Sequence, residues 1–183
     1  YKGIKGFQVQ TRTEDPTPYA QALADNPYGG VWSSGGSLNQ ARYLMGAAGT
    51  YTASIAFGGA PPPSAPPTTT NITESYNGTS WTEVNDLNNA RYWLAGLGTS
   101  TAAFAVAGDS PNYAYVESWD GSSWTETTDV NTGRGGLGAA GTTTAAVAYG
   151  GRVTTTAQVI NESWNGSAWT EVNDLSTARI TFA

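Results

Sequence analysis

The chain of 183 residues contains no cysteine and no histidine. Without cysteine it can form neither disulfide bonds nor thiolate metal sites. Without histidine it lacks the commonest general base and metal ligand of proteins. We therefore expect no metal site, no cofactor and no catalytic residue, and we interpret the protein as a non-enzyme.

Charge is also scarce, at 12% of residues, and the net charge is −6. Both lysines, Lys2 and Lys5, lie at the start of the chain. A chain without a basic patch has little with which to neutralise phosphates, so we do not expect a nucleic-acid partner. No apolar run approaches the ~20 residues that cross a bilayer, so membrane insertion is not expected either.

Glycine, with 23 residues, and threonine are abundant instead, which favours an all-β, turn-rich fold. One phrase occurs three times, at residues 74–83 (ESYNGTSWTE), 117–126 (ESWDGSSWTE) and 162–171 (ESWNGSAWTE). Asn-Gly or Asp-Gly between such flanks predicts a β-hairpin in which both central turn residues have positive φ. Each copy therefore predicts two antiparallel strands joined by a tight turn.

The hairpin belongs to a longer repeat, marked by an arginine roughly every 45 residues. The arginines are Arg42, Arg91, Arg134 and Arg179. Each of the first three precedes two apolar stretches rich in alanine and glycine, a variable loop and then the hairpin. Four short strands per unit predict a β-propeller, with small residues near the axis and aromatic residues packed between adjacent blades. A β-solenoid is the alternative, although its coils are usually shorter.

The repeat sets the expected domain organisation. Residues 1–31 are predicted to be an N-terminal extended arm that docks on the rest of the chain or on a neighbouring subunit, a flexible terminus being the alternative. Residues 32–183 are predicted to hold whole blades at about 42–84, 91–127 and 134–172. Residues 32–35 and 179–183 would supply parts of a closing blade. Because propellers usually have four to eight blades, we expect an incomplete ring, which either further polypeptide or neighbouring subunits complete.

The order of these markers resembles the kelch repeat over about residues 32–183. The recurring residues are Arg42, Arg91 and Arg134, then Glu74, Glu117 and Glu162, and then Trp81, Trp124 and Trp169. The second strands end in Gly58-Gly59 and Gly150-Gly151, whereas the second unit departs with Ala107-Gly108. A further departure is the spacing of the two hairpin aromatics, which is one residue shorter than in the family.

Phrases such as WTEVNDLNNAR also resemble kelch-like arrays in structural proteins of marine tailed bacteriophages. That resemblance implies a virion protein of the tail, a fibre or the surface, located outside the cell and oligomeric within its assembly. Its partners would be other virion proteins and a host-surface protein or glycan. The alternative is an extracellular carbohydrate-binding propeller, either a lectin or a glycan-active enzyme.

Most of the fourteen acidic residues recur in the repeat, which favours scaffold roles over catalysis. They are Glu74, Glu117 and Glu162, Glu83, Glu126 and Glu171, and Asp86, Asp129 and Asp174. We expect the first set to pair with the repeated arginines, and the aspartates to cap the following loop. A ring of carboxylates that binds a cation is the alternative. Four acids do not recur and have no visible catalytic partner: Glu14, Asp15, Asp25 and Asp109.

The loops between the second and third strands vary from unit to unit, and rigid scaffolds commonly place binding residues in such loops. The first of these loops is proline-rich and favours polyproline II. We therefore expect binding residues in these loops, with relaxed spacers as the alternative. The candidates are Pro62, Pro66, Asp109, Asn112, Tyr113, Tyr115 and Arg152.

Overall fold

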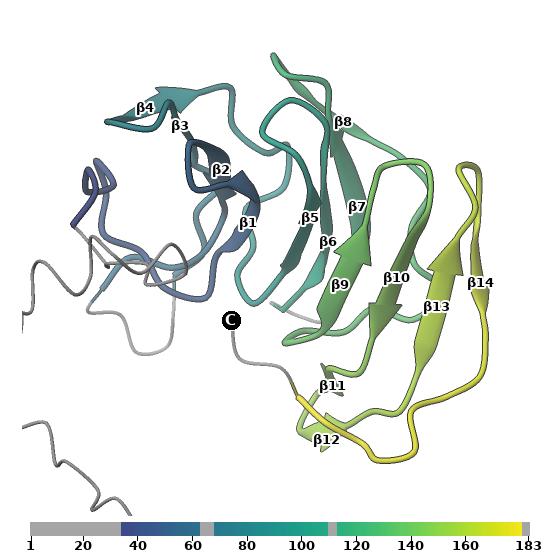
Figure 1. Cartoon of the computed structure of the whole chain (residues 1–183). Helices are drawn as coiled ribbons and strands as arrows, with labels where there is room; N and C mark the ends of the chain where they lie inside the picture. The colour runs from purple at the N-terminus through teal and green to yellow at the C-terminus, as the bar shows by residue number, and fades with distance from the viewer. Residues whose placement is uncertain (1–33, 63–67, 110–112, 181–183) are drawn as a thin grey trace, which may run out of the picture. The chain divides into compact units, whose positions relative to one another are not determined.

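A computed structural model describes residues 34–62, 68–109 and 113–180. These residues form an all-β structure in which every strand pairs antiparallel with its neighbour (Figure 1). The part of the chain described contains no helix, and hence no helix that could cross a bilayer. The predicted arm at 1–31 and the candidates Pro66 and Asn112 lie outside the described residues.

Three four-stranded sheets, one for each predicted unit, make up nearly all of the described fold. The first contains β1 (Gly46–Thr50), β2 (Ala53–Phe57), β3 (Thr73–Tyr76) and β4 (Trp81–Val84). The second contains β5 (Ala95–Gly98), β6 (Ala103–Gly108), β7 (Tyr113–Trp119) and β8 (Trp124–Glu126). The third contains β9 (Gly138–Gly141), β10 (Ala146–Tyr149), β13 (Asn161–Trp164) and β14 (Trp169–Glu171). A small hairpin, β11 (Arg152–Val153) and β12 (Thr156–Ala157), fills the loop of the third unit.

The three predicted hairpins are present, but the predicted turn type is wrong. Tyr76 pairs with Trp81, so four residues rather than two connect β3 to β4. Of the turn residues only Gly78 has positive φ. Asn77 instead accepts the backbone N–H groups of residues 79 and 80 through Oδ1, each at 3.0 Å. Asp120 and Asn165 close the other two turns in the same way.

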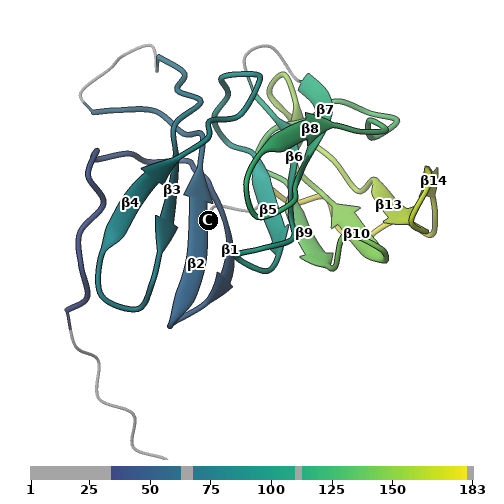
Figure 2. The same cartoon turned by 90° about the horizontal axis from the view of Figure 1, so that it is seen from above.

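Neighbouring sheets meet along their first strands, β1 beside β5 and β5 beside β9 (Figures 1 and 2). Strands β1 and β5 lie close together at Gly96, where an added Cβ would lie 2.2 Å from the carbonyl oxygen of Ala47. No side chain fits at Gly96, in agreement with the alanine and glycine content of these strands.

Apolar residues fill the space between adjacent sheets. Phe57 of the first sheet meets Trp124 of the second edge-on, with ring centroids 4.8 Å apart. Phe104 of the second sheet meets Trp164 of the third in the same manner, at 5.7 Å. Each core cluster thus contains residues of two successive sheets, which confirms that the aromatic residues of the outer strands pack between repeat units.

Candidate functional site

The repeated arginine and the repeated glutamate form a buried ion pair in each unit. Arg42 lies 2.8 Å from Glu74, and the equivalent contacts join Arg91 to Glu117 and Arg134 to Glu162. All six side chains are fully buried. The arginine comes from the segment that enters the sheet and the glutamate from its third strand, so the predicted pairing fixes that segment to the sheet.

An asparagine three residues before each arginine completes this arrangement. Asn88 donates its backbone N–H and its side-chain N–H to Glu117 Oε2, at 2.7 and 2.9 Å. Its side chain also donates to the carbonyl of Trp124 at 3.0 Å. Asn39 and Asn131 repeat these contacts in the other two units. The glutamate therefore joins the entering segment to the third strand, and its carboxylate is fully engaged.

The first of the three arginines is held differently from the others. In Arg91 and Arg134, Nε donates to a backbone carbonyl at 2.9 Å. In Arg42, Nε is buried without a hydrogen-bond partner among the described residues. Burial lowers the pKa of Arg42, and the nearby carboxylate of Glu74 opposes that shift.

Two of the three repeated aspartates bond the third strand and not the loop that follows them. Asp86 accepts the N–H of Thr73 at 3.0 Å, and Asp129 accepts that of Val116 at 3.2 Å. Asp174 is exposed and makes no equivalent bond within the described ranges. The described part of the chain contains no group of three or more acidic side chains that could hold a metal ion.

The non-repeating residues gather at the end of the sheets where the variable loops lie. Asp109 and Arg152, from the loops of the second and third units, form an ion pair at 2.5 Å. The guanidinium of Arg152 lies 3.9 Å from the ring centroid of Trp93, which precedes β5. These three residues define the loop-end cluster, which joins two units; Trp93 and Arg152 are partly exposed, whereas Asp109 is buried.

Tyrosines extend this cluster. Tyr92 packs on Trp93, and its pKa is raised by burial and then by the carboxylate of Asp109. Tyr113 and Tyr115 stack on each other at 5.0 Å. They were predicted to lie in the loop, but β7 begins at Tyr113 and holds both in a strand. Pro62, another candidate, is exposed in the loop of the first unit.

Backbone geometry at this end is unusual for the residue types present. Leu44 and Trp93 occupy the same repeat position and have φ of 56° and 57°, where Gly136 has 62°. Trp93 donates its N–H to the carbonyl of Leu44 at 2.7 Å, and Gly136 donates to that of Trp93 at 2.8 Å. These bonds link the three units in sequence. They hold the backbone of Leu44 and Trp93 in a left-handed conformation, which costs of order 1 kcal/mol for a residue with a side chain.

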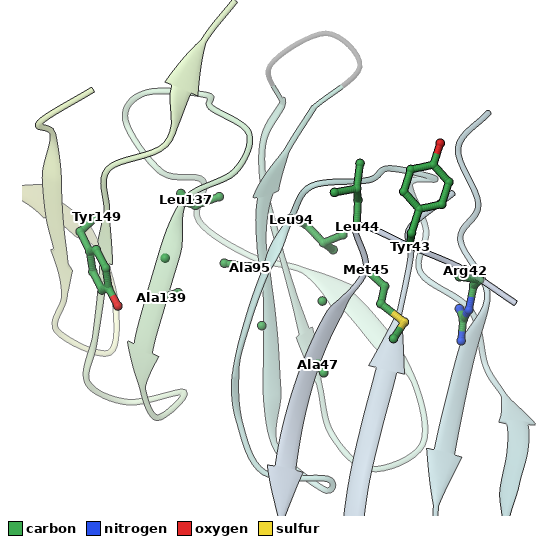
Figure 3. Close-up of a pocket in the computed structure, with 13 residues that line it drawn as sticks. Arg42, Tyr43, Leu44, Met45, Ala47, Leu94, Ala95, Leu137, Ala139 and Tyr149 are labelled. Atoms are coloured by element: carbon green, nitrogen blue, oxygen red, sulfur yellow. The ribbon is translucent and has the colours of Figure 1, made fainter. Parts of the chain in front are cut away.

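A cavity of about 650 Å³ lies beside the first strands of the three sheets (Figure 3). Small residues such as Ala47, Gly96 and Ala139 form much of its wall, with Tyr149 on one side. Among the described residues that line it there is no carboxylate, and the guanidinium of Arg42 is paired with Glu74. The described part of the lining is therefore mainly apolar, apart from Arg42 and the two tyrosines, Tyr43 and Tyr149.

The Asp109–Arg152 pair was missed at the sequence level, where Asp109 had no visible partner. The sequence nevertheless contains a signal for this ion pair. Asp109 and Arg152 both directly follow the glycine that ends a second strand, as Ala60 does in the first unit. Opposite charges at one repeat position, in units that stand side by side, predict such a contact.

No protein-family model matches the chain, and a search of curated proteins finds no match to its sequence.

Proposed function

We propose that the protein is a non-catalytic, kelch-like β-propeller of a tailed-phage virion. It contacts a host surface or neighbouring virion proteins through the loop-end cluster. The fold part of this proposal is supported by three four-stranded sheets that meet along their first strands, as propeller blades do. The virion part is supported by the resemblance of the repeat sequences.

One observation supports the binding role: charged and aromatic residues that do not repeat lie together. Asp109, Arg152 and Trp93 form a fixed cluster at the end where the sequence varies most. Binding residues commonly lie on loops that a rigid scaffold positions. The ion pair and the cation–π contact hold the arginine in place before a partner arrives, which reduces the entropy lost on binding.

The scaffold role of the recurring carboxylates supports a non-catalytic protein. Glycosidases need two carboxylates a few ångströms apart with different pKa values. Glu74, Glu117 and Glu162 are instead each neutralised by an arginine and bonded to an asparagine. Carboxylates engaged in this way are poor candidates for proton transfer.

The test of the virion role is co-sedimentation. The protein should be found by peptide mass spectrometry in purified, intact particles of the phage whose genome encodes it. A variant with Asp109→Ala and Arg152→Ala should still fold but should lose binding to host cells. Absence of the protein from particles would contradict the virion role.

Carbohydrate binding is the second candidate, favoured by the stacked pair Tyr113 and Tyr115 beside the cluster. Aromatic faces of this kind suit the apolar faces of sugars. Calorimetry with surface polysaccharides, together with an assay for new reducing ends, separates the two candidates. Turnover abolished by substitution of a single non-repeating acid would overturn the non-catalytic proposal.

A further inference from the structure

The contact between successive sheets occurs twice within the described chain, with corresponding residues. One side, here called the leading face, is formed in the first sheet by Ile55, Phe57 and Leu87, none more than 1% exposed. In the second sheet it is formed by Phe104, Val106 and Val130, none more than 3% exposed. The opposite side, the trailing face, carries two aromatic residues of the next sheet. These are Trp119 and Trp124 in the second sheet and Trp164 and Trp169 in the third.

The leading face of the third sheet has no sheet packed on it within the described residues. Val147, Tyr149 and Leu175 occupy the leading-face positions, yet each is only partly buried. Asn161 lies at the position of Thr73, whose hydroxyl oxygen accepts the indole N–H of Trp124 at 3.1 Å. The side-chain oxygen of Asn161 is buried and has no hydrogen-bond partner among these residues. This face therefore lacks a donor at the place where a tryptophan of a following sheet would supply one.

The segment after the third sheet is placed as if another sheet followed. Gly151 donates its N–H to the carbonyl of Arg179 at 2.9 Å, as Gly59 does to the carbonyl of Arg91. Arg179 is exposed, however, and its Nε donates only a long hydrogen bond, 3.4 Å, to the carbonyl of Thr177 within the described chain. The buried glutamate that pairs with each earlier arginine has no counterpart here within the described chain.

The first sheet presents the complementary half of the contact. Tyr76 and Trp81 occupy the trailing-face positions and are partly exposed, whereas their counterparts in the other two sheets are 3–6% exposed. The indole N–H of Trp81 donates to the carbonyl of Gly36, in the segment that enters the sheet. Glu74 lies on the same sheet and is paired with Arg42, the least completely bonded of the three arginines that form buried ion pairs.

We propose that the leading face of the third sheet binds the trailing face of the first sheet of a second copy of this chain. Arg179 of one copy replaces Arg42 at Glu74 of the other, and residues 35–42 of that other copy move aside. Trp81, released from Gly36, donates to Asn161. The contact reproduces an interface that the chain already forms twice. It gives Asn161 a donor and Arg179 a carboxylate, in exchange for the bonds that Trp81 makes to Gly36 and Arg42 to Glu74.

This self-association goes beyond the proposed virion role and depends only on the sheet-to-sheet geometry. The described residues of two copies supply twice three four-stranded sheets, within the range of about four to eight that closed propellers use. If a two-fold axis relates the two copies, two identical contacts close such a ring. If the rotation between successive copies does not close, the same contact gives longer oligomers.

The test is light scattering coupled to size exclusion, over about a hundredfold range of concentration, on the whole 183-residue chain. We expect a dimer that dissociates on dilution. Val147→Lys places a charge on the leading face and should give a monomer, whereas the control Tyr51→Lys, at a side chain 91% exposed, should stay dimeric. Arg179→Ala should raise the dissociation constant by at least about tenfold, because Glu74 then has no cation from the partner.

A mixing experiment tests the two faces separately. Trp81→Ala should also be monomeric, but mixed with Val147→Lys it should form a heterodimer, because one intact face remains on each. Circular dichroism must show that both variants are folded; if Trp81→Ala is not, Tyr76→Lys takes its place. Longer oligomers that Val147→Lys abolishes would equally support the contact. A monomeric wild type at every concentration, or an associating Val147→Lys protein, would overturn the proposal.

Discussion

Trp124 donates its indole N–H to the hydroxyl oxygen of Thr73 at 3.1 Å, across the boundary between the second and first sheets. Both residues are buried. At the next boundary Trp169 has the same place as Trp124, but Val116 stands where Thr73 does, and the indole N–H of Trp169 has no partner among the described residues. The two boundaries therefore differ by one hydrogen bond.

The first prediction removes that bond. Thr73→Val should destabilise the protein by about 1–3 kcal/mol, because a buried indole N–H loses its acceptor while the side-chain volume is kept. Urea unfolding followed by circular dichroism measures the change. Thr82→Val, at an exposed position of the neighbouring β4, is the control and should change stability by less than about 0.5 kcal/mol.

The second prediction supplies the missing bond. Val116→Thr should give Trp169 an acceptor and stabilise the protein by about 0.5–1.5 kcal/mol. The same urea titration measures it, and the indole N–H resonance of Trp169 should shift. A loss of stability comparable to that of Thr73→Val would show that the two boundaries are not equivalent.

The third prediction concerns the buried ion pairs. Arg91→Met should cost about 3–5 kcal/mol, because the carboxylate of Glu117 is left buried and without its cation. Glu126→Gln, at an exposed recurring glutamate of the same sheet, should be nearly neutral. Equal effects of the two substitutions in a denaturant titration would contradict the scaffold role assigned to the first set of glutamates.

The fourth prediction concerns the approach of the first two sheets. Gly96→Ala should destabilise the protein by about 1–3 kcal/mol, because the new Cβ would overlap backbone atoms of Ala47. Gly35→Ala is the matched control, since its Cβ would meet only the hydroxyl end of Tyr76, at 3.1 Å. Thermal unfolding of both variants gives the comparison, and an unaffected Gly96→Ala protein would place β1 and β5 farther apart.

The fifth prediction is a pH dependence at one turn. Hydrogen bonds from the Ser122 hydroxyl, and from the backbone N–H groups of Ser123 and Ser122, lower the pKa of Asp120 to about 2. A pKa lowered by folding stabilises the protein above the unfolded value of 3.8, and this contribution is lost as the pH falls through about 2. Carboxyl-carbon NMR should give the low pKa. Asp120→Asn gives this turn the same residue as the turns at Asn77 and Asn165 and removes the titrating carboxyl group. The free energy of unfolding of this variant should therefore lose the pH dependence that Asp120 contributes in that range.

The sequence predicted the sheets and the ion pairs because both depend on local signals that repeat. The Asn-Gly and Asp-Gly turns locate the hairpins, and Arg91 recurs in register with Glu117. A residue that recurs with a fixed partner spacing identifies a contact within one unit. The buried ion pairs confirm the predicted pairing of arginine and glutamate in all three units.

Contacts between units were harder to predict. Asp109 and Arg152 lie in different units and differ in charge, so neither shows a repeating pattern. The turn type was also wrong, because the side chain of Asn77 takes up two backbone N–H groups that a two-residue turn would not present. In both cases the deciding interaction is made by a side chain whose direction the repeat pattern does not specify.

The packing of neighbouring repeat units face to face is the central claim, and nuclear Overhauser effects test it most directly. Cross-peaks should join the ring protons of Phe57 to those of Trp124, and those of Phe104 to those of Trp164, since the ring centroids are 4.8 and 5.7 Å apart. Each pair spans two sheets, so contacts within one sheet cannot produce these signals. Spectra in which each phenylalanine shows cross-peaks only to its own sheet would contradict the account.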